Sequence, residues 1–344
     1  MKPAAKSGPA SEKKYFCPGC GFAMEQGDDF CYHCKKFVDW EQGRVRKPEE
    51  VTDSMLDSLI LRSSMQSQTY QQEAEIKKYK TGVIFIIIGV VLFITLILFL
   101  VGLIFIAVGV VKVLSVKNAP KGCLTPEEMS SVLDEYIVLP VLRESFDRVE
   151  EYHHDRGIST ITIHKIQLMQ KPYNKTEGSD YIRAVHRGVP FERSDTILTR
   201  EYQKTGGIPA SELVFRGSFL IVPLKLSLPE DVTVWEQNPS GSSFEEKYHA
   251  ESRHPETADS LLTPERKRLI SQLDDAADGQ ITLKFMQDGF LCIANASDRD
   301  LFQTSDQEKS AAAIRERFRQ EAASIGRVMT LLSDADICKM QSDM

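Results

Sequence analysis

Apolar residues are distributed unevenly along this chain, and one uninterrupted apolar segment stands out. No charged residue occurs from Gly82 to Val111, a stretch of 30 residues. As one helix it would be about 45 Å long, whereas the hydrocarbon core of a bilayer is about 30 Å thick. Lysines flank both ends, at positions 77, 78 and 80 before the segment and 112, 117 and 121 after it. This pattern predicts a membrane-embedded segment with cytosolic flanks.

A near-repeat within this segment favours two short helices over one long helix. The ten residues from Gly82, GVIFIIIGVV, match those from Gly102, GLIFIAVGVV, at seven positions. One straight helix would need a tilt of about 48°, beyond the usual range of about 0–40°. We therefore predict a membrane hairpin over residues 81–116, with one tilted span as the alternative. It implies a protein of the bacterial inner (cytoplasmic) membrane with both chain ends in the cytosol and the lipid bilayer as a partner.

Helical spacing of apolar residues precedes the membrane segment. Val51, Met55 and Leu59 recur at intervals that suit one face of a helix, and the following residues are polar and rich in glutamine. This pattern predicts a helical stalk over residues 51–80. Its polar second half favours a solvated stalk over a helix docked on another element.

Beyond residue 117 the pattern changes to short strands between helices. Thr125, Pro126 and Glu128 predict a capped helix start, and Pro140 is expected to kink or split that helix, which we extend to His154. Alternating apolar and polar positions predict strands in ISTITIHKIQLM, DYIRAVHRGVPFERSDTILTREYQ, ELVFRGSFLIVPLKL, EDVTVWEQ and GQITLKFMQDGFLCIANA. The last of these contains a hairpin turn at Gln287-Asp288-Gly289.

Two further helices complete this region. Thr263 and Pro264 start one of them, and Ser305 with Glu308 predicts a capping box for the other. The apolar face of the last helix consists of Ile314, Phe318, Ala322, Ile325, Met329 and Leu332. Strands with helices before and after them predict a cytosolic α+β domain over residues 117–344, built on an antiparallel sheet.

Four cysteines near the beginning of the chain have the spacing of a metal site. Cys17, Cys20, Cys31 and Cys34 form the pattern C-x2-C-x10-C-x2-C. Two Cys-x-x-Cys turns supply four thiolates at tetrahedral corners, which suits zinc, and iron in a rubredoxin-like site is the alternative. His33 is expected to be a bystander because four cysteines complete the coordination. The site is therefore predicted to be a structural Zn²⁺ site in a zinc ribbon over residues 15–37, with Phe16 and Phe30 as its small apolar core.

The remaining segments and the charge balance narrow the function. Residues 1–14 are expected to be a disordered leader and residues 38–50 a charged linker. The chain has 42 basic and 49 acidic residues, and the stretch 117–344 holds 28 and 37 of them. Nucleic-acid-binding domains have the opposite balance, so we expect no nucleic-acid partner.

No catalytic motif is recognisable. The sequence lacks a nucleophile elbow, a phosphate-binding loop, a dinucleotide fingerprint and a zincin helix. His153, His154 and Asp155 are interpreted as a solvated helix end. The other candidates are interpreted as residues without a catalytic role. His164 and His186 are expected in strands, Asp274 and Asp275 in a loop, and Cys292 in a buried strand. Cys123 and Cys338 are expected to be isolated thiols.

The C-terminal region resembles a known family. The order FRGSFLIVPLKL, EEKYHAESRHPETADSLLTPERKRLISQL, ITLKFMQDGFLCIANASDRDLFQ is similar to bacterial membrane proteins catalogued as domain of unknown function 3137, over about residues 70–335. The resemblance implies a membrane hairpin followed by an α+β domain. It implies no activity and no catalytic residue, and the zinc ribbon is an addition to the family pattern.

Together these features predict a multi-domain protein with a small zinc ribbon, a transmembrane helical hairpin and an α+β domain. A closed metal site and a domain without a catalytic motif favour a membrane-anchored, non-enzymatic role in protein–protein interaction or scaffolding. The partner would be an unidentified protein, and a homo-oligomer is compatible with this arrangement. The alternative is an enzyme whose site lies in the α+β domain without a local motif.

Overall fold

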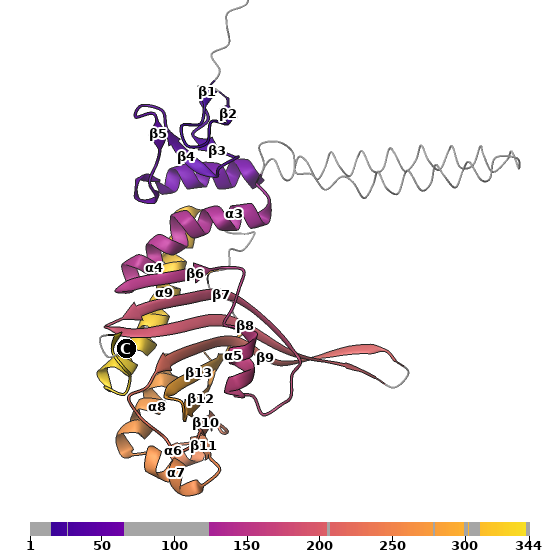
Figure 1. Ribbon diagram of the computed structural model, residues 1–344, viewed down its shortest axis with the longest axis vertical. Coiled ribbons are helices and arrows are strands. Elements are labelled where there is room, and N and C mark those ends of the chain that lie inside the picture. Colours follow the sequence, from indigo (N-terminus) through magenta and orange to yellow (C-terminus); the bar gives the residue numbers. More distant parts are fainter. Residues whose placement is uncertain are drawn as a thin grey trace, which may run out of the picture. The chain divides into compact units, whose positions relative to one another are not determined.

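The computed structural model describes residues 15–64, 124–298, 302 and 310–341, apart from positions 26, 205, 206 and 278. The chain divides into two compact units. The first comprises Met1–Leu133 with Lys309–Ala311, and the second comprises Asp134–Glu308 with Ala312–Met344. Figure 1 gives the order of the elements along the chain.

Short antiparallel strands form the beginning of the first unit. Strand β1 (Tyr15–Phe16) pairs with β2 (Ala23–Met24), and β4 (Lys36–Asp39) lies between β3 (Phe30–Cys31) and β5 (Arg44–Val45). A 3₁₀ turn, η1 (Pro48–Glu50), follows, and Arg44 donates two hydrogen bonds of 2.7 Å to Glu50. The folded module therefore continues past residue 37 into the segment that was expected to be a linker.

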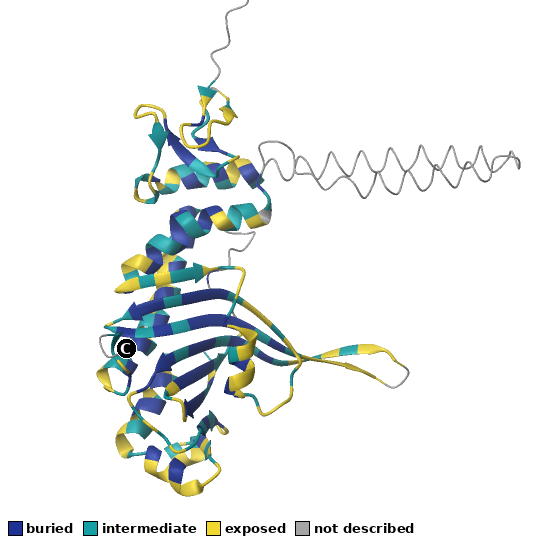
Figure 2. Cartoon of the chain, in the orientation of Figure 1, coloured by how far each residue is buried: buried dark blue, intermediate teal, exposed yellow. Residues whose placement is uncertain are grey.

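Two helices complete the described part of the first unit. Residues 53–64 are helical, and Leu56 and Leu59 on this helix are 1% and 3% exposed, so it packs here instead of standing in solvent. Helix α3 (Pro126–Leu133) begins with the predicted capping box: Thr125 N–H donates to Glu128, and Glu128 N–H donates to Thr125 Oγ1. Figure 2 shows the alternation of buried and exposed positions along these helices.

The second unit is built on one antiparallel sheet of eight strands, in the order β11-β10-β12-β13-β9-β8-β7-β6. Hairpin connections join β7 to β8, β8 to β9, and β12 to β13, and the last of these is the hairpin that the sequence predicted. The strands are β6 (Arg148–His153), β7 (Lys175–His186), β8 (Val189–Gln203), β9 (Pro209–Pro223), β10 (Val232–Glu236), β11 (Tyr248–Glu251), β12 (Gln280–Met286) and β13 (Phe290–Ala296).

Helices pack on both faces of this sheet. On one face, α5 (Thr160–Ile166) contributes Ile163 and Ile166 to a core with Phe215, Phe219 and Cys292. On the other face lie α8 (Pro264–Ala276) and α9 (Ala311–Asp334). The predicted apolar face of α9 is buried throughout, from Ile314 to Leu332. The remaining helical segments are a π-helical stretch η2 (Asp134–Val138), α4 (Leu139–Ser145), α6 (Phe244–Lys247) and α7 (Pro255–Leu261).

Two predicted elements of this unit differ from the structure. The segment predicted as a strand around ISTITIHKIQLM forms α5, because Ser159 caps a helix by accepting a hydrogen bond from Thr162 N–H. The helix predicted to run to His154 ends at Ser145, and Arg148–His153 pairs with β7 as the edge strand β6. Local alternation is therefore a weaker guide here than helix capping and sheet pairing.

The prediction of a membrane hairpin requires correction. Among the helices that the structure describes, none is both long and apolar enough to cross a bilayer. The longest of them, α9, carries charged residues such as Arg315, Arg319 and Arg327. The predicted hairpin at 81–116 lies outside the described residues. The predicted fold class with a transmembrane hairpin and the predicted inner-membrane localisation are therefore withdrawn, and so is the lipid bilayer as a predicted partner. The described fold consists of a cysteine-containing module and an antiparallel sheet domain.

Candidate functional site

The four N-terminal cysteines lie in two similar turns. After Cys17, Gly21 N–H bonds to the Cys17 carbonyl at 2.8 Å, and after Cys31, Lys35 N–H bonds to the Cys31 carbonyl at 2.7 Å. The residue directly after the second cysteine of each turn has a positive φ, 74° at Gly21 and 60° at Lys35. Glycine adopts this conformation without strain at the first turn. Both turns therefore present their two sulfurs to a common point.

The arrangement of the sulfurs fits one metal ion. All four Sγ atoms lie within 4.8 Å of one another. Two pairs, Cys17 with Cys34 and Cys20 with Cys31, are 3.6 and 3.7 Å apart. A tetrahedral zinc site with Zn–S bonds of about 2.3 Å has sulfur–sulfur edges of about 3.8 Å. The four cysteines are therefore placed where a single metal ion such as zinc could be bound.

Backbone N–H groups form hydrogen bonds to the sulfur of the first cysteine in each turn, Cys17 and Cys31. Burial opposes ionisation of the Cys17 thiol, but the N–H groups of Gly19 and Cys20 lower its pKa. The N–H groups of His33 and Cys34 act in the same direction on Cys31, where burial outweighs them and raises the pKa. Amide donors that stabilise thiolates are typical of metal-binding cysteine turns.

The surroundings of the cluster differ from the sequence prediction in one respect. Phe30 and Phe37 are buried with ring centroids 5.0 Å apart, whereas Phe16 is 53% exposed and does not belong to the core. Phe22 is 51% exposed and stacks on His33 at 4.8 Å. The His33 ring therefore covers an exposed aromatic side chain and lies outside the group of four candidate ligands.

The two adjacent histidines of the second unit do not form one site. His153 is exposed at the end of β6. His154 Nδ1 forms an ion pair with Asp134, and Asp155 is exposed. The group therefore lies at the end of a strand and not at the helix end that the sequence suggested, and His154 contacts the partly buried carboxylate of Asp134.

The other candidates from the sequence have structural roles. His164 lies on α5 and stacks on Tyr173 at 5.0 Å, and His186 Nε2 is 3.0 Å from Thr330 Oγ1. Asp274 accepts a hydrogen bond of 2.7 Å from Tyr248 and pairs with Lys247, whereas Asp275 is exposed. Burial raises the pKa of the Cys292 thiol, and it raises the pKa of the Cys338 thiol to about 12, so both favour the protonated, less reactive form. Cys123 lies outside the described residues.

Sequence analysis missed a buried acidic cluster in the second unit. The Tyr152 hydroxyl lies 3.0 Å from Asp180 Oδ1 and 3.3 Å from Asp134 Oδ1. These residues are far apart in the sequence and meet because β6 pairs with β7 next to η2. Only a polar residue inside an apolar strand, Asp180 before Tyr181 and Ile182, hints at the cluster in the sequence.

Asp180 is held in an unusual environment. Its φ is 52°, and it lies where the pairing register of β7 with β8 shifts, between Ser179 and Ile182. Nearby along β7, Gly178 packs against Gly157 so closely that a Cβ on either glycine would lie within 2.8 Å of the other's backbone. Burial, followed by the charge of Asp195, raises the pKa of Asp180 to about 7, although Arg193 and Tyr152 act against the shift. This carboxyl group is therefore partly protonated near neutral pH.

Replacing Asp180 with asparagine tests this environment. Because the folded-state pKa lies above the ordinary value, the folded chain keeps a proton that the unfolded chain loses, so wild-type stability falls as the pH rises from about 4 to about 7. Asp180→Asn removes this dependence, and asparagine tolerates positive φ. We expect the variant to be more stable than wild type by about 2–4 kcal/mol at pH 8, with no gain at pH 4.

The measurement is urea unfolding between pH 4 and pH 8, followed by hydrogen exchange of β7 and β8 amides. Asp275→Asn, the same change at an exposed position, is the control and should alter stability by less than about 0.5 kcal/mol at every pH. Parallel pH profiles for wild type and Asp180→Asn would show that Asp180 is ionised at its ordinary pKa in the folded chain.

Comparisons with known proteins leave the function open. No family model matches the chain, and no curated protein matches it. The resemblance to the family of domain of unknown function 3137 therefore stays a prediction. Among solved structures, the crystal structure of the mycobacterial trehalose monomycolate transport factor A, TtfA, is similar at 7% identity and a TM-score of 0.29, over 56% of this chain and 92% of that chain. A likeness this weak carries no argument about this chain.

Proposed function

We propose that the protein is a non-enzymatic interaction protein whose N-terminal module is a zinc ribbon that docks on another protein. Four thiolates fill the coordination sphere of a zinc ion, so such a site is closed to substrates and serves folding. The module has only a small apolar core around Phe30 and Phe37, and metal binding supplies the stability that this core lacks.

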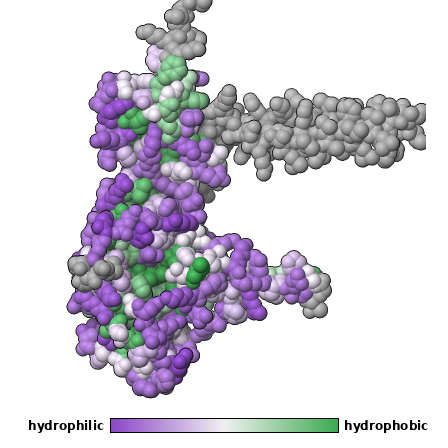
Figure 3. Space-filling model, viewed as in Figure 1, coloured by the Kyte–Doolittle hydropathy of each residue, from purple (hydrophilic) through white to green (hydrophobic). Residues whose placement is uncertain are grey.

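The observation that carries the proposal is an exposed aromatic pair beside the cysteine cluster. Phe16 and Phe22 are each about half exposed, at 53% and 51%, in a module with little apolar surface to spare. Phe16 belongs to β1 and Phe22 directly precedes β2, and Figure 3 shows hydrophobic residues gathered over these two strands. Rigid aromatic side chains that are exposed in the free protein are typical anchors of protein interfaces.

The second unit offers another exposed apolar element. The distal parts of β8 and β9 extend beyond the rest of the sheet as a two-stranded arm (Figure 1). Tyr202, Ile208 and Leu213 on this arm are 41%, 62% and 57% exposed. Two separate apolar elements on one chain support a scaffolding role, because two linked contacts bind more tightly than either alone.

The alternative, an enzyme without a recognisable motif, has weaker support. His153 and His154 do not converge on one point, and the imidazole of His154 is engaged by Asp134. The second unit has a cavity between the sheet and α9, and none of the three members of the acidic cluster, Asp134, Tyr152 and Asp180, lines it. These placements favour binding over turnover.

A photo-crosslinking amino acid at position 22 tests the proposed docking surface in cells. We expect a covalent product with one defined protein from position 22 and none from position 41, an exposed glutamate of the same module. Phe16→Ser should weaken capture at position 22 about 30-fold, the effect of losing about 2 kcal/mol at an aromatic anchor. Metal content should not change in that variant. Equal yields at positions 22 and 41, or no product at either, would contradict the proposal.

A further inference from the structure

The second unit contains a cavity of about 720 Å³ between the sheet and α9. Sites for small molecules have volumes of about 300–1,000 Å³, so the cavity has the size of a ligand site. Strand register places its polar floor: Asn295 pairs with Ser218, and Ser218 pairs with Asp195, in one row across three strands. Because successive side chains of a strand alternate between the two faces of the sheet, the row two positions further along the strands points to the same face. That second row is Ile293, Leu220 and Arg193.

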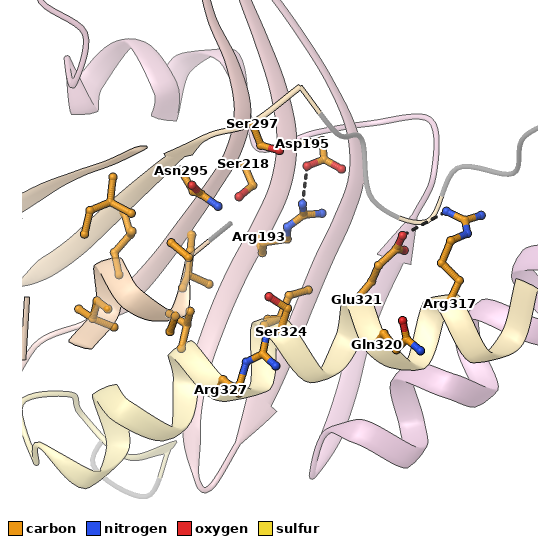
Figure 4. Close-up of a pocket in the computed structure, with 18 residues that line it drawn as sticks. Arg193, Asp195, Ser218, Asn295, Ser297, Arg317, Gln320, Glu321, Ser324 and Arg327 are labelled. Carbon is orange, nitrogen blue, oxygen red and sulfur yellow. Dashed lines mark hydrogen bonds and ion pairs between the residues drawn. The ribbon is translucent and has the colours of Figure 1, made fainter. Parts of the chain in front are cut away.

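A buried arginine at this floor has an unused donor. Arg193 is 2% exposed, and its Nη2 donates to Asp195 Oδ1, as Figure 4 shows. The Nη1 atom is buried and has no hydrogen-bond partner among the residues that the structure describes. Nearly all buried polar groups in proteins are hydrogen-bonded, and a guanidinium left partly unpaired is costly. A ligand that brings an acceptor to Nη1 would remove this cost.

A second polar group of the cavity is also unpaired. The Oδ1 atom of Asn295 is buried and has no hydrogen-bond partner in the described part of the chain. Ser218 and Ser324 also line the cavity, from β9 and α9 respectively. The polar end of the cavity therefore offers an open guanidinium donor, a buried amide and hydroxyl groups (Figure 4).

Charge at the cavity favours an anion. Arg317 pairs with Glu321 at 3.1 Å, and Arg193 pairs with Asp195. Burial raises the pKa of Glu321, although the Phe302 N–H and the charges of Arg317 and Arg193 act against the shift. Arg327, an exposed residue of α9, also lines the cavity. The described lining therefore holds three arginines and two carboxylates.

The rest of the lining forms an apolar wall. It consists of Leu220, Leu273, Ala276, Ala277, Ile281, Ile293, Ile325 and Val328. An inorganic anion would leave this wall in contact with water, and a purely apolar ligand would leave Arg193 Nη1 unpaired. A ligand with one anionic group on an aliphatic body satisfies both ends.

We propose that this cavity binds a small amphiphilic monocarboxylate. Its carboxylate would accept a hydrogen bond from Arg193 Nη1, and its aliphatic chain would lie along the apolar wall between α8, α9 and the sheet. The inference uses only residues of the second unit and does not depend on the proposed role of the N-terminal module.

Calorimetric titration of the full chain with decanoate tests this proposal. We expect one decanoate per chain, at least tenfold tighter than decanol, which has the same chain without a charge. Acetate and inorganic phosphate should give no detectable binding. Equal affinity for decanol and decanoate would contradict the proposal, because Arg193 would then not bind the carboxylate of the ligand. Binding of phosphate would also contradict it, because the site would then bind anions without using its apolar wall. Absence of decanoate binding would overturn the proposal.

Variants locate the binding. Arg193→Gln should weaken decanoate at least tenfold. Because this change leaves Asp195 buried without its partner, Ser324→Phe provides a second test: it fills the cavity from α9 and keeps the Arg193–Asp195 pair. Ser324→Phe should also weaken decanoate at least tenfold. The control is Ala323→Phe, at an exposed neighbouring position of α9, which should bind decanoate like wild type. Undiminished binding by Ser324→Phe would place the ligand elsewhere and refute the proposed site.

Discussion

Replacing Cys17 and Cys31 together with serine is expected to remove the bound metal and to unfold the module of residues 15–46. Each change removes the first ligand of one cysteine turn, and two remaining thiolates cannot complete a tetrahedral site. Structural zinc sites contribute an apparent free energy of about 10–16 kcal/mol in small modules. The few buried apolar side chains here, chiefly Phe30, Phe37 and Val38, cannot replace that contribution.

Metal content per chain and limited proteolysis measure this effect. The double variant should contain no zinc and should be cleaved within residues 15–46 under conditions in which wild type is resistant. Hydrogen exchange in β7, β8 and α9 should stay unchanged, since these elements belong to the second unit. Cys338→Ser is the control because it removes a cysteine outside the cluster and should keep the metal. A double variant with unchanged zinc content and protease resistance would show that the cysteines do not hold the module together.

Phe318→Ala is expected to lower the free energy of unfolding of the second unit by about 3–5 kcal/mol. Phe318 is fully buried on α9, and its ring contacts Phe302 edge to face, with centroids 5.4 Å apart. Truncation removes the transfer free energy of the ring and leaves a cavity that the rigid sheet cannot fill. The effect should therefore be near the upper end for a single substitution.

Urea unfolding monitored by hydrogen exchange of α9 and β9 amides measures the change. Glu316→Ala, at an exposed position of the same helix, is the matched control and should change stability by less than about 0.5 kcal/mol. A similarly small effect of Phe318→Ala would mean that the apolar face of α9 is not part of the core in solution and is open to a partner.

Elements with strong local signals were predictable from the sequence. The capping box at Thr125 and Glu128 forms as expected, and the hairpin turn with Gly289 joins β12 to β13. The periodic face of α9 is buried at every predicted position. In each case the local pattern and the tertiary packing favour the same structure, so propensity alone is sufficient.

Elements that depend on distant partners were not predictable. β6 was read as the end of a helix because EEYHH has no strand signal of its own, and it is fixed by pairing with β7. α5 alternates like a strand, yet it packs as a helix on the sheet. The apolar run before residue 117 also gave a clear signal in the sequence, and the membrane fold predicted from it had to be withdrawn.

The candidate sites also differ in how far apart their residues lie in the sequence, and this decides whether they could be predicted. The cysteine cluster was predictable because its ligands lie in two short turns, and their spacing alone determines how the sulfurs can meet. The acidic cluster of Asp134, Tyr152 and Asp180 was not predictable because it joins three elements separated by up to 46 positions along the chain. The same holds for Arg193 and Asn295, which face one cavity only through the register of three strands.

X-ray absorption at the zinc edge of the purified full-length protein tests the central claim most directly. The claim is that Cys17, Cys20, Cys31 and Cys34 form a closed four-thiolate zinc site. It predicts one zinc per chain with four sulfur neighbours at about 2.3 Å and no nitrogen or oxygen ligand. A shell of three sulfurs and one nitrogen or oxygen would instead show that His33 or water completes the site, and a chain without zinc would contradict the account.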